Sequence, residues 1–209
     1  MFNLPNKITI FRMAMMPVLI FFFLAEFIKP WNYLIAVIIF LVSALSDMVD
    51  GYIARHYNMV TDLGKLLDPI ADKLLATTAL CLLMVGHSTF EPVLILPVGL
   101  TFMFIMLFRD YTVTGLRQFA QLRGVVIMAD KVAKLKANFL YATLFYGLLI
   151  SFLREIVTHA TVMLVLNIIL YVLVAATSIL IIVSLIDYIF VTIKNTKGKK
   201  ELKFESNKI

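Results

Sequence analysis

The stretch SDMVDGYIARHYNMVTDLGKLLDPIADK, residues 46 to 73, places four aspartates besides Asp62 between the apolar runs at residues 33 to 45 and 74 to 85. The four are Asp47, Asp50, Asp68 and Asp72. A carboxylate at a membrane boundary is costly, so a cluster of them needs cations beside it or a function. The stretch therefore predicts two membrane helices that carry an acidic functional site at one boundary.

The composition supports this interpretation. Of the 209 residues, 62% are hydrophobic and only 15% are charged, and the mean hydropathy is +0.96. A soluble domain of this length cannot bury so much apolar surface. We expect an all-α integral membrane protein with one domain, residues 1 to 209, that ends in a basic cytoplasmic tail from residue 194 to residue 209. The single cysteine, Cys81, excludes a disulfide framework.

Six apolar segments predict six transmembrane helices, because each is near or above the ~20 residues that span a bilayer. The segments are residues 8–27, 33–56, 66–86, 93–119, 133–153 and 162–193. An even number of spans puts both termini on one side. Of the 19 Lys and Arg residues, only Lys29 and Arg154 fall on the other side. The positive-inside rule then predicts an inner-membrane protein whose termini and aspartates face the cytoplasm.

The first residues allow two interpretations. Polar side chains between Asn3 and Thr9 precede the first apolar segment. They predict either a short interfacial helix, bent from the first span at Pro17, or a plain positively charged flank. The residues alone leave both alternatives open.

The spacing of the aspartates predicts two acidic stripes. Asp47 and Asp50 are three residues apart, and Gly64, Asp68 and Asp72 follow one another at intervals of four, so each set shares a helix face. Carboxylates without His or Cys select Mg²⁺, Mn²⁺ or Ca²⁺ over zinc. Four negative charges can hold two divalent ions.

Small residues border these acids. Gly51, Ala54 and Gly64 either let a substrate approach the backbone or let the helices pack closely. Arg55 can clamp a phosphate or pair with an aspartate. Paired divalent ions beside an arginine, next to lipid, suggest phosphoryl transfer.

The aspartate window matches the pattern D-x-x-D-G-x-x-A-R-(x8)-G-x-x-x-D-x-x-x-D throughout. With this signature the chain resembles the CDP-alcohol phosphotransferase family. Three further stretches look like the branch of the family that uses glycerol 3-phosphate: LPNKITIFR at residues 4 to 12, RDYTVTGLR at residues 109 to 117 and KLK at residues 134 to 136. Asp110 stands where that branch often has glutamate, and Ala133 where many members have glycine.

The resemblance implies an activity. It is the transfer of the phosphatidyl group from CDP-diacylglycerol to sn-glycerol 3-phosphate, which gives phosphatidylglycerophosphate and CMP in phospholipid biosynthesis. Six transmembrane helices, a homodimer and two divalent cations, Mg²⁺ or Mn²⁺, are also implied. The implied metal ligands are Asp47, Asp50, Asp68 and Asp72, and Asp72 is the implied general base. The implied CDP-binding residues are Asp50, Gly51, Ala54, Arg55 and Gly64.

Four cations outside the signature predict a site for the acceptor phosphate. They are Arg109, Arg117, Lys134 and Lys136, at the cytoplasmic ends of the fourth and fifth segments. A doubly charged phosphate monoester needs such bases, and arginine binds phosphate with a planar fork. The alternative is that these residues are positive-inside anchors.

Other functions stay open. The same chemistry can use inositol phosphate, serine or phosphatidylglycerol as the acceptor. A cation-coupled or proton-coupled transporter also has membrane carboxylates, but usually near the midplane, and here no second half of the chain repeats the pattern. The basic tail has no aromatic or glycine-rich RNA-binding pattern. The expected partners are therefore CDP-diacylglycerol, glycerol 3-phosphate and membrane lipids, with no nucleic acid.

Overall fold

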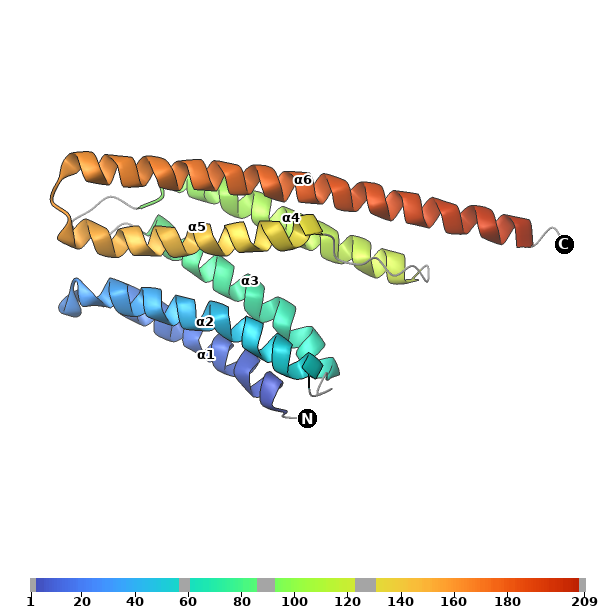
Figure 1. Cartoon of the computed structure of the whole chain (residues 1–209), viewed down its shortest axis with the longest axis horizontal. Coiled ribbons are helices and arrows are strands. Elements are labelled where there is room, and N and C mark those ends of the chain that lie inside the picture. The colour runs from blue at the N-terminus through green and yellow to red at the C-terminus, as the bar shows by residue number, and fades with distance from the viewer. Residues whose placement is uncertain (1–2, 57–60, 86–92, 123–130, 207–209) are drawn as a thin grey trace. The chain divides into compact units, whose positions relative to one another are not determined.

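The structure is a computed structural model that describes residues 3–56, 61–85, 93–122 and 131–206. Side chains are described within these ranges except at positions 48, 50–55, 62, 65, 131–134 and 195–206. The described residues form six α-helices and one short 3₁₀ turn, without a β-strand among them (Figure 1). The prediction of an all-α protein is confirmed.

Each predicted segment corresponds to one helix. The elements are α1 (Leu4–Leu24), η1 (Glu26–Ile28), α2 (Trp31–His56), α3 (Asp62–Met84), α4 (Leu96–Leu122), α5 (Lys131–Ile156) and α6 (Ala160–Ser206). The largest differences are at the ends of the chain, where α1 begins before residue 8 and α6 continues beyond residue 193. Hydropathy marks only the part of a helix that suits lipid, so the polar turns at both ends escape it.

α1 is one helix from its first turn onward. Pro5 lies in that first turn, where the missing N–H of proline costs no helical hydrogen bond. Pro17 lies inside the same helix. The polar residues from Asn6 to Thr9 therefore belong to α1 itself and do not form a separate helix.

Four of the described helical segments are long and apolar enough to cross a membrane. They are Leu4–Leu24, Leu96–Leu122, Leu135–Ile156 and Ala160–Lys194. α2 contributes a shorter apolar stretch, Trp31–Asp47. The described part of α3 falls below this criterion because it carries three charged residues, Asp68, Asp72 and Lys73. The coarse prediction of a helical membrane protein is thus supported.

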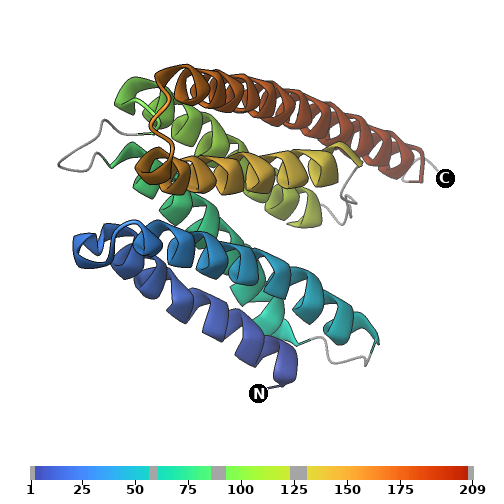
Figure 2. The same cartoon turned by 60° about the vertical axis from the view of Figure 1, so that its left-hand side comes forward.

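The chain divides into two compact units. The first comprises Met1–Gly99 and Leu140–Tyr171, and the second comprises Leu100–Phe139 and Val172–Ile209. In the first unit α1 packs closely against both α2 and α3, which contact each other much less. Figures 1 and 2 both show α1 alongside α2. Side chains from α1 therefore lie where α2 and α3 could otherwise meet.

Small residues and polar pairs hold the remainder of the first unit. A Cβ atom on Gly147 of α5 would lie 2.6 Å from Cδ1 of Leu83 of α3, so a larger residue there would require the Leu83 side chain to shift. Near the link between α1 and α2, Nζ of Lys29 lies 3.6 Å from a carboxylate oxygen of Glu155. Arg154 donates a hydrogen bond of 3.0 Å to Asn167. The Lys29–Glu155 pair joins the link between α1 and α2 to α5.

In the second unit α4 and α6 form an apolar seam. Val113 and Ala120 of α4 are buried with Tyr188 of α6. On another part of α4 the rings of Phe104 and Phe108 stack with centroids 5.8 Å apart, and both rings are exposed. Exposed apolar side chains are expected on helices surrounded by lipid.

Candidate active site

A buried arginine joins the two acidic stripes. Nη1 of Arg12, on α1, donates to Oδ1 of Asp47 at 2.9 Å and to Oδ1 of Asp72 at 3.0 Å. Its Nε lies 3.3 Å from Oγ of Ser46 on α2. The Arg12 side chain is 0% exposed, whereas those of Asp47 and Asp72 are 41% and 42% exposed. The predicted convergence of α2 and α3 is therefore observed for these two acids, and a cation from α1 lies between them.

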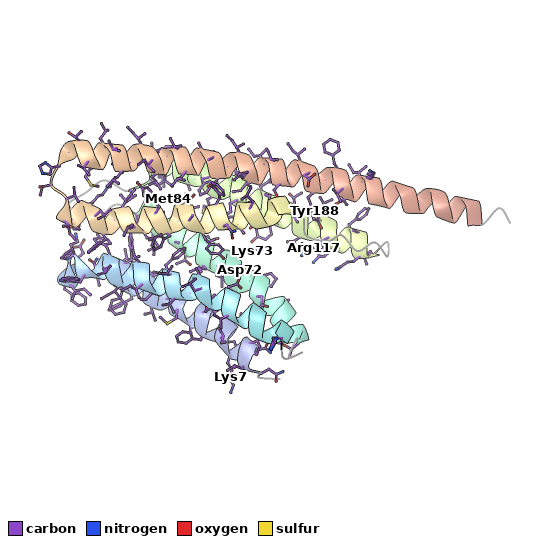
Figure 3. All side chains as sticks on the ribbon, viewed as in Figure 1. Lys7, Asp72, Lys73, Met84, Arg117 and Tyr188 are labelled. Atoms are coloured by element: carbon purple, nitrogen blue, oxygen red, sulfur yellow. The ribbon has the colours of Figure 1, made fainter. Side chains whose placement is uncertain are left out.

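The third described aspartate is also bonded to α1. Oγ1 of Thr9 donates to Oδ1 of Asp68 at 2.9 Å. Thr9 is buried and Asp68 is partly exposed. Figure 3 labels Asp72, one turn further along α3, beside Lys73. All three aspartates of the signature whose side chains are described thus have partners in the first three turns of α1.

Gly64 lies against the same end of α1. Oγ1 of Thr61 caps α3 by accepting a hydrogen bond of 3.0 Å from the Gly64 amide, and it donates to Oδ1 of Asn6 at 2.9 Å. A Cβ atom on Gly64 would lie 2.8 Å from the same Asn6 oxygen. Glycine at this position therefore permits close helix packing, which was one of the two alternatives for the small residues.

The sequence analysis did not single out Asn6, Thr9 and Arg12 as site residues. A periodic signal was available, because the buried face of α1 continues from these three at similar spacing to Met16, Leu19 and Phe23. Polar residues on the buried face of a helix need partners on neighbouring helices. The nearest available acids are those of the signature.

The donor set fits a hard divalent cation. Its described members are carboxylate oxygens. The side chains of Asp47 and Asp72, which bond to the same nitrogen of Arg12, are substantially exposed. Among the described residues no group of three or more His, Cys, Asp or Glu is placed to hold a metal. The side chain of Asp50, the fourth predicted ligand, lies outside the described residues. The four-aspartate site therefore stays a prediction.

Five predicted site residues are described by their backbone alone. They are Asp50, Gly51, Ala54, Arg55 and Lys134. The backbone at the first four is helical within α2, and at Lys134 it is helical within α5.

The second unit contains a mostly buried cationic cluster. Nη1 of Arg109 lies 3.1 Å from Oδ1 of Asp110, and Nζ of Lys136 lies 2.9 Å from the same oxygen. Nη2 of Arg109 donates to Oγ of Ser184 at 2.8 Å. The side chains of Arg109 and Lys136 are 11% and 7% exposed. Two cations thus converge on one carboxylate oxygen.

Arg109 and Arg117 have different surroundings although both lie on α4. Arg109 is mostly buried, and its Nε is buried without a hydrogen-bond partner among the described groups. Arg117 is exposed and is labelled in Figure 3. Their shared role in binding the acceptor stays a prediction.

Comparisons with known proteins agree with the signature. A model of the CDP-alcohol phosphatidyltransferase family matches residues 2–193. A protein of Bacillus subtilis (strain 168) named CDP-diacylglycerol–glycerol-3-phosphate 3-phosphatidyltransferase is 38% identical over 146 residues, which are 65% of this chain and 71% of that protein. A Rickettsia bellii (strain RML369-C) protein of the same name is 38% identical over 135 residues, 64% of this chain and 68% of that protein. One from Cereibacter sphaeroides is 37% identical over 136 residues, 65% of this chain and 58% of that protein.

Fold and site together define an all-helical membrane protein whose acidic signature is gathered beside a buried arginine. The chain belongs to the CDP-alcohol phosphatidyltransferase family, because the match includes all six helices as far as residue 193. The family resemblance read from the signature is confirmed. Members of the family generally depend on divalent cations.

Proposed function

We propose that this chain transfers the phosphatidyl group from CDP-diacylglycerol to sn-glycerol 3-phosphate, giving phosphatidylglycerophosphate and CMP in phospholipid biosynthesis. The observation that carries the proposal is the complete family signature, in which Asp47 and Asp72 meet at one buried guanidinium. The relatives that bear the name of this activity support the choice of substrates.

The proposed setting is the inner membrane. All six helices span it, the chain acts as one domain, and both termini and the aspartates face the cytoplasm. The distribution of Lys and Arg supports this orientation, because only Lys29 and Arg154 fall on the other side. The acyl chains of the donor then stay in the inner leaflet while its nucleotide reaches the aspartates. The family resemblance also supports a homodimer.

In the proposed reaction Asp72 is the general base. Its carboxylate accepts the proton of the primary hydroxyl of sn-glycerol 3-phosphate. The oxygen forms a bond to the phosphorus that carries diacylglycerol. The bond from that phosphorus to the oxygen of CMP breaks, and CMP leaves with the electron pair. The exposed part of the Asp72 side chain gives the hydroxyl access to the base.

Asp47, Asp50, Asp68 and Asp72 would hold the two divalent cations, Mg²⁺ or Mn²⁺. When bound, these ions would supply positive charge beside the pyrophosphate. Gly51, Ala54 and Arg55 would bind CDP together with Asp50 and Gly64. Because Gly64 is covered by Asn6 on one side, its contribution to that site is close packing of the surrounding backbone.

The acceptor phosphate is assigned to Arg109, Arg117, Lys134 and Lys136. The pairing of Arg109 and Lys136 with the one carboxylate of Asp110 supports this assignment, because it gathers two cations at one place. A phosphate monoester would compete with Asp110 and Ser184 for the Arg109 fork. Neutral acceptors such as serine would gain little from these cations.

The first prediction is an acceptor preference. Purified full-length protein in detergent, supplied with CDP-diacylglycerol and Mg²⁺ or Mn²⁺, should release CMP fastest with sn-glycerol 3-phosphate. Inositol phosphate, serine and phosphatidylglycerol should give much slower release. Absence of CMP release with every acceptor would refute the proposed enzymatic activity. Faster release with inositol phosphate would keep the reaction class and correct the acceptor.

The second prediction concerns Arg109. Arg109→Gln should raise the KM for glycerol 3-phosphate by about 10-fold to 100-fold, the worth of a charge-assisted hydrogen bond, and should change kcat little. Arg117→Gln should also raise the KM for glycerol 3-phosphate, but by less, because Arg117 is exposed. Steady-state kinetics with each substrate varied in turn measures both constants. An unchanged KM in both variants would identify these arginines as membrane anchors.

A further inference from the structure

The inner face of α1 carries a row of polar side chains. Asn6, Thr9 and Arg12 are spaced three residues apart, and all are buried. Each bonds to a residue at or near one of the acidic stripes. Because α1 packs against both α2 and α3, this row is the structural link between the stripes. The family signature itself contains no residue of α1.

Arg12 carries the strongest constraint in this row. Two carboxylates that bond to a single nitrogen are close neighbours, and without a cation between them they repel each other. A guanidinium with 0% exposure is equally costly unless it is paired with acids. Each charge therefore depends on the others, and the three groups are held as a unit.

The burial of Arg12 separates its role from that of a substrate ligand. No part of the side chain is exposed, so it acts on the reaction only through the groups that it bonds. Its bonds to Asp47 and Asp72 each reach the Oδ1 oxygen, and the same two side chains are about two-fifths exposed. This arrangement fixes the orientation of Asp47 and Asp72 while leaving them accessible from outside the protein.

We propose that Arg12 is a positioning residue that holds Asp47 and Asp72 together and compensates their charge before a divalent cation binds. This inference rests on the proposed function, in which these acids are metal ligands and Asp72 is the base. Thr9 orients Asp68 in a similar way, through a hydrogen bond that its neutral hydroxyl donates to the carboxylate. The first three turns of α1 are thus part of the site although they touch no substrate.

The test compares Arg12→Gln with the wild-type chain, full length in detergent, using Mn²⁺ alone as the probe. Without metal, the Tm of the variant should fall by about 10 °C, because a buried ion pair loses one partner. Added Mn²⁺ should then raise the Tm by more in the variant than in the wild type, because the ion replaces the missing cation. In the transferase assay kcat should fall about 100-fold, since the base is no longer held in place, while the KM for glycerol 3-phosphate should change little.

Arg12→Lys keeps the charge and loses the fork, so its Tm and its Mn²⁺ shift should lie between those of the wild type and Arg12→Gln. The matched control is Arg154→Gln, which removes another arginine of the same unit that bonds to Asn167. This variant should show the wild-type Mn²⁺ shift. If Mn²⁺ raised the Tm equally in the wild type and both Arg12 variants, and kcat stayed at the wild-type value, the proposed role of Arg12 would be overturned. The proposed function would not be. A wild-type protein with neither an Mn²⁺ shift nor CMP release would overturn the proposed function as well.

Discussion

Replacing Asp72 by asparagine should reduce the rate of CMP release by about 1,000-fold or more. General-base catalysis contributes roughly 100-fold to 10,000-fold, and asparagine cannot accept the proton of the attacking hydroxyl. The substitution also removes one of the negative charges proposed to hold the divalent ions. Single-turnover measurement of CMP release, with CDP-diacylglycerol and glycerol 3-phosphate both saturating, isolates the chemical step from binding.

The same variant should keep its fold and part of its response to metal. The amide oxygen of asparagine can still accept the hydrogen bond that Nη1 of Arg12 donates to Oδ1 of Asp72. Asp47 and Asp68 are unchanged, so Mn²⁺ should still raise the Tm, by less than in the wild type. Asp62→Asn is the control, because Asp62 begins the same helix outside the signature. Turnover within about tenfold of wild type in Asp72→Asn would show that another group is the base.

Hydropathy was sufficient to predict the helices because membrane helices have a simple physical requirement. Every backbone polar group must be satisfied inside the segment, so a long apolar run is a helix. The requirement ends where water begins. The first turn of α1, which carries Asn6, lies before the segment that hydropathy predicted, although it is continuous with it.

The acids of the site could be predicted, whereas their cation could not. Asp68 and Asp72 share a stripe because of spacing within one helix, which is a local property. Arg12 is 35 residues from Asp47 and 60 from Asp72 in the sequence, so their pairing depends on how α1 packs. In the sequence alone, a lone arginine near the N-terminus has the properties of a positive-inside flank. Only its complete burial distinguishes it.

Helical spacing also failed to distinguish Arg109 from Arg117. Both occur in one stretch, and a shared role follows from their spacing only if their surroundings are similar. Arg109 is mostly buried beside Asp110 and Ser184, and Arg117 is exposed. The difference arises from the packing of α6 on α4. This packing cannot be predicted from the spacing of the two arginines in the sequence. The burial of Lys136 has the same origin in tertiary packing.

Removal of divalent cations should abolish CMP release completely, and Mg²⁺ or Mn²⁺ should restore it. The described donors are carboxylate oxygens, a set that prefers these ions to zinc. Dialysis of the purified protein against EDTA, followed by titration with each ion under the same assay, measures the requirement. EDTA saturated with Mg²⁺ beforehand is the control for effects of the chelator itself. Undiminished CMP release in EDTA would contradict the metal-dependent mechanism.

The helical structure should survive the same treatment. One guanidinium already lies between Asp47 and Asp72, and Thr9 already bonds to Asp68, so the acids do not depend on an ion alone to stay in place. Far-ultraviolet circular dichroism should therefore be unchanged in EDTA. The Tm should fall only as far as the lost free energy of ion binding requires, about 2.7 kcal/mol at an ion concentration 100 times Kd. Loss of helical signal together with activity would mean that the ions build the site and that the row of polar residues on α1 does not.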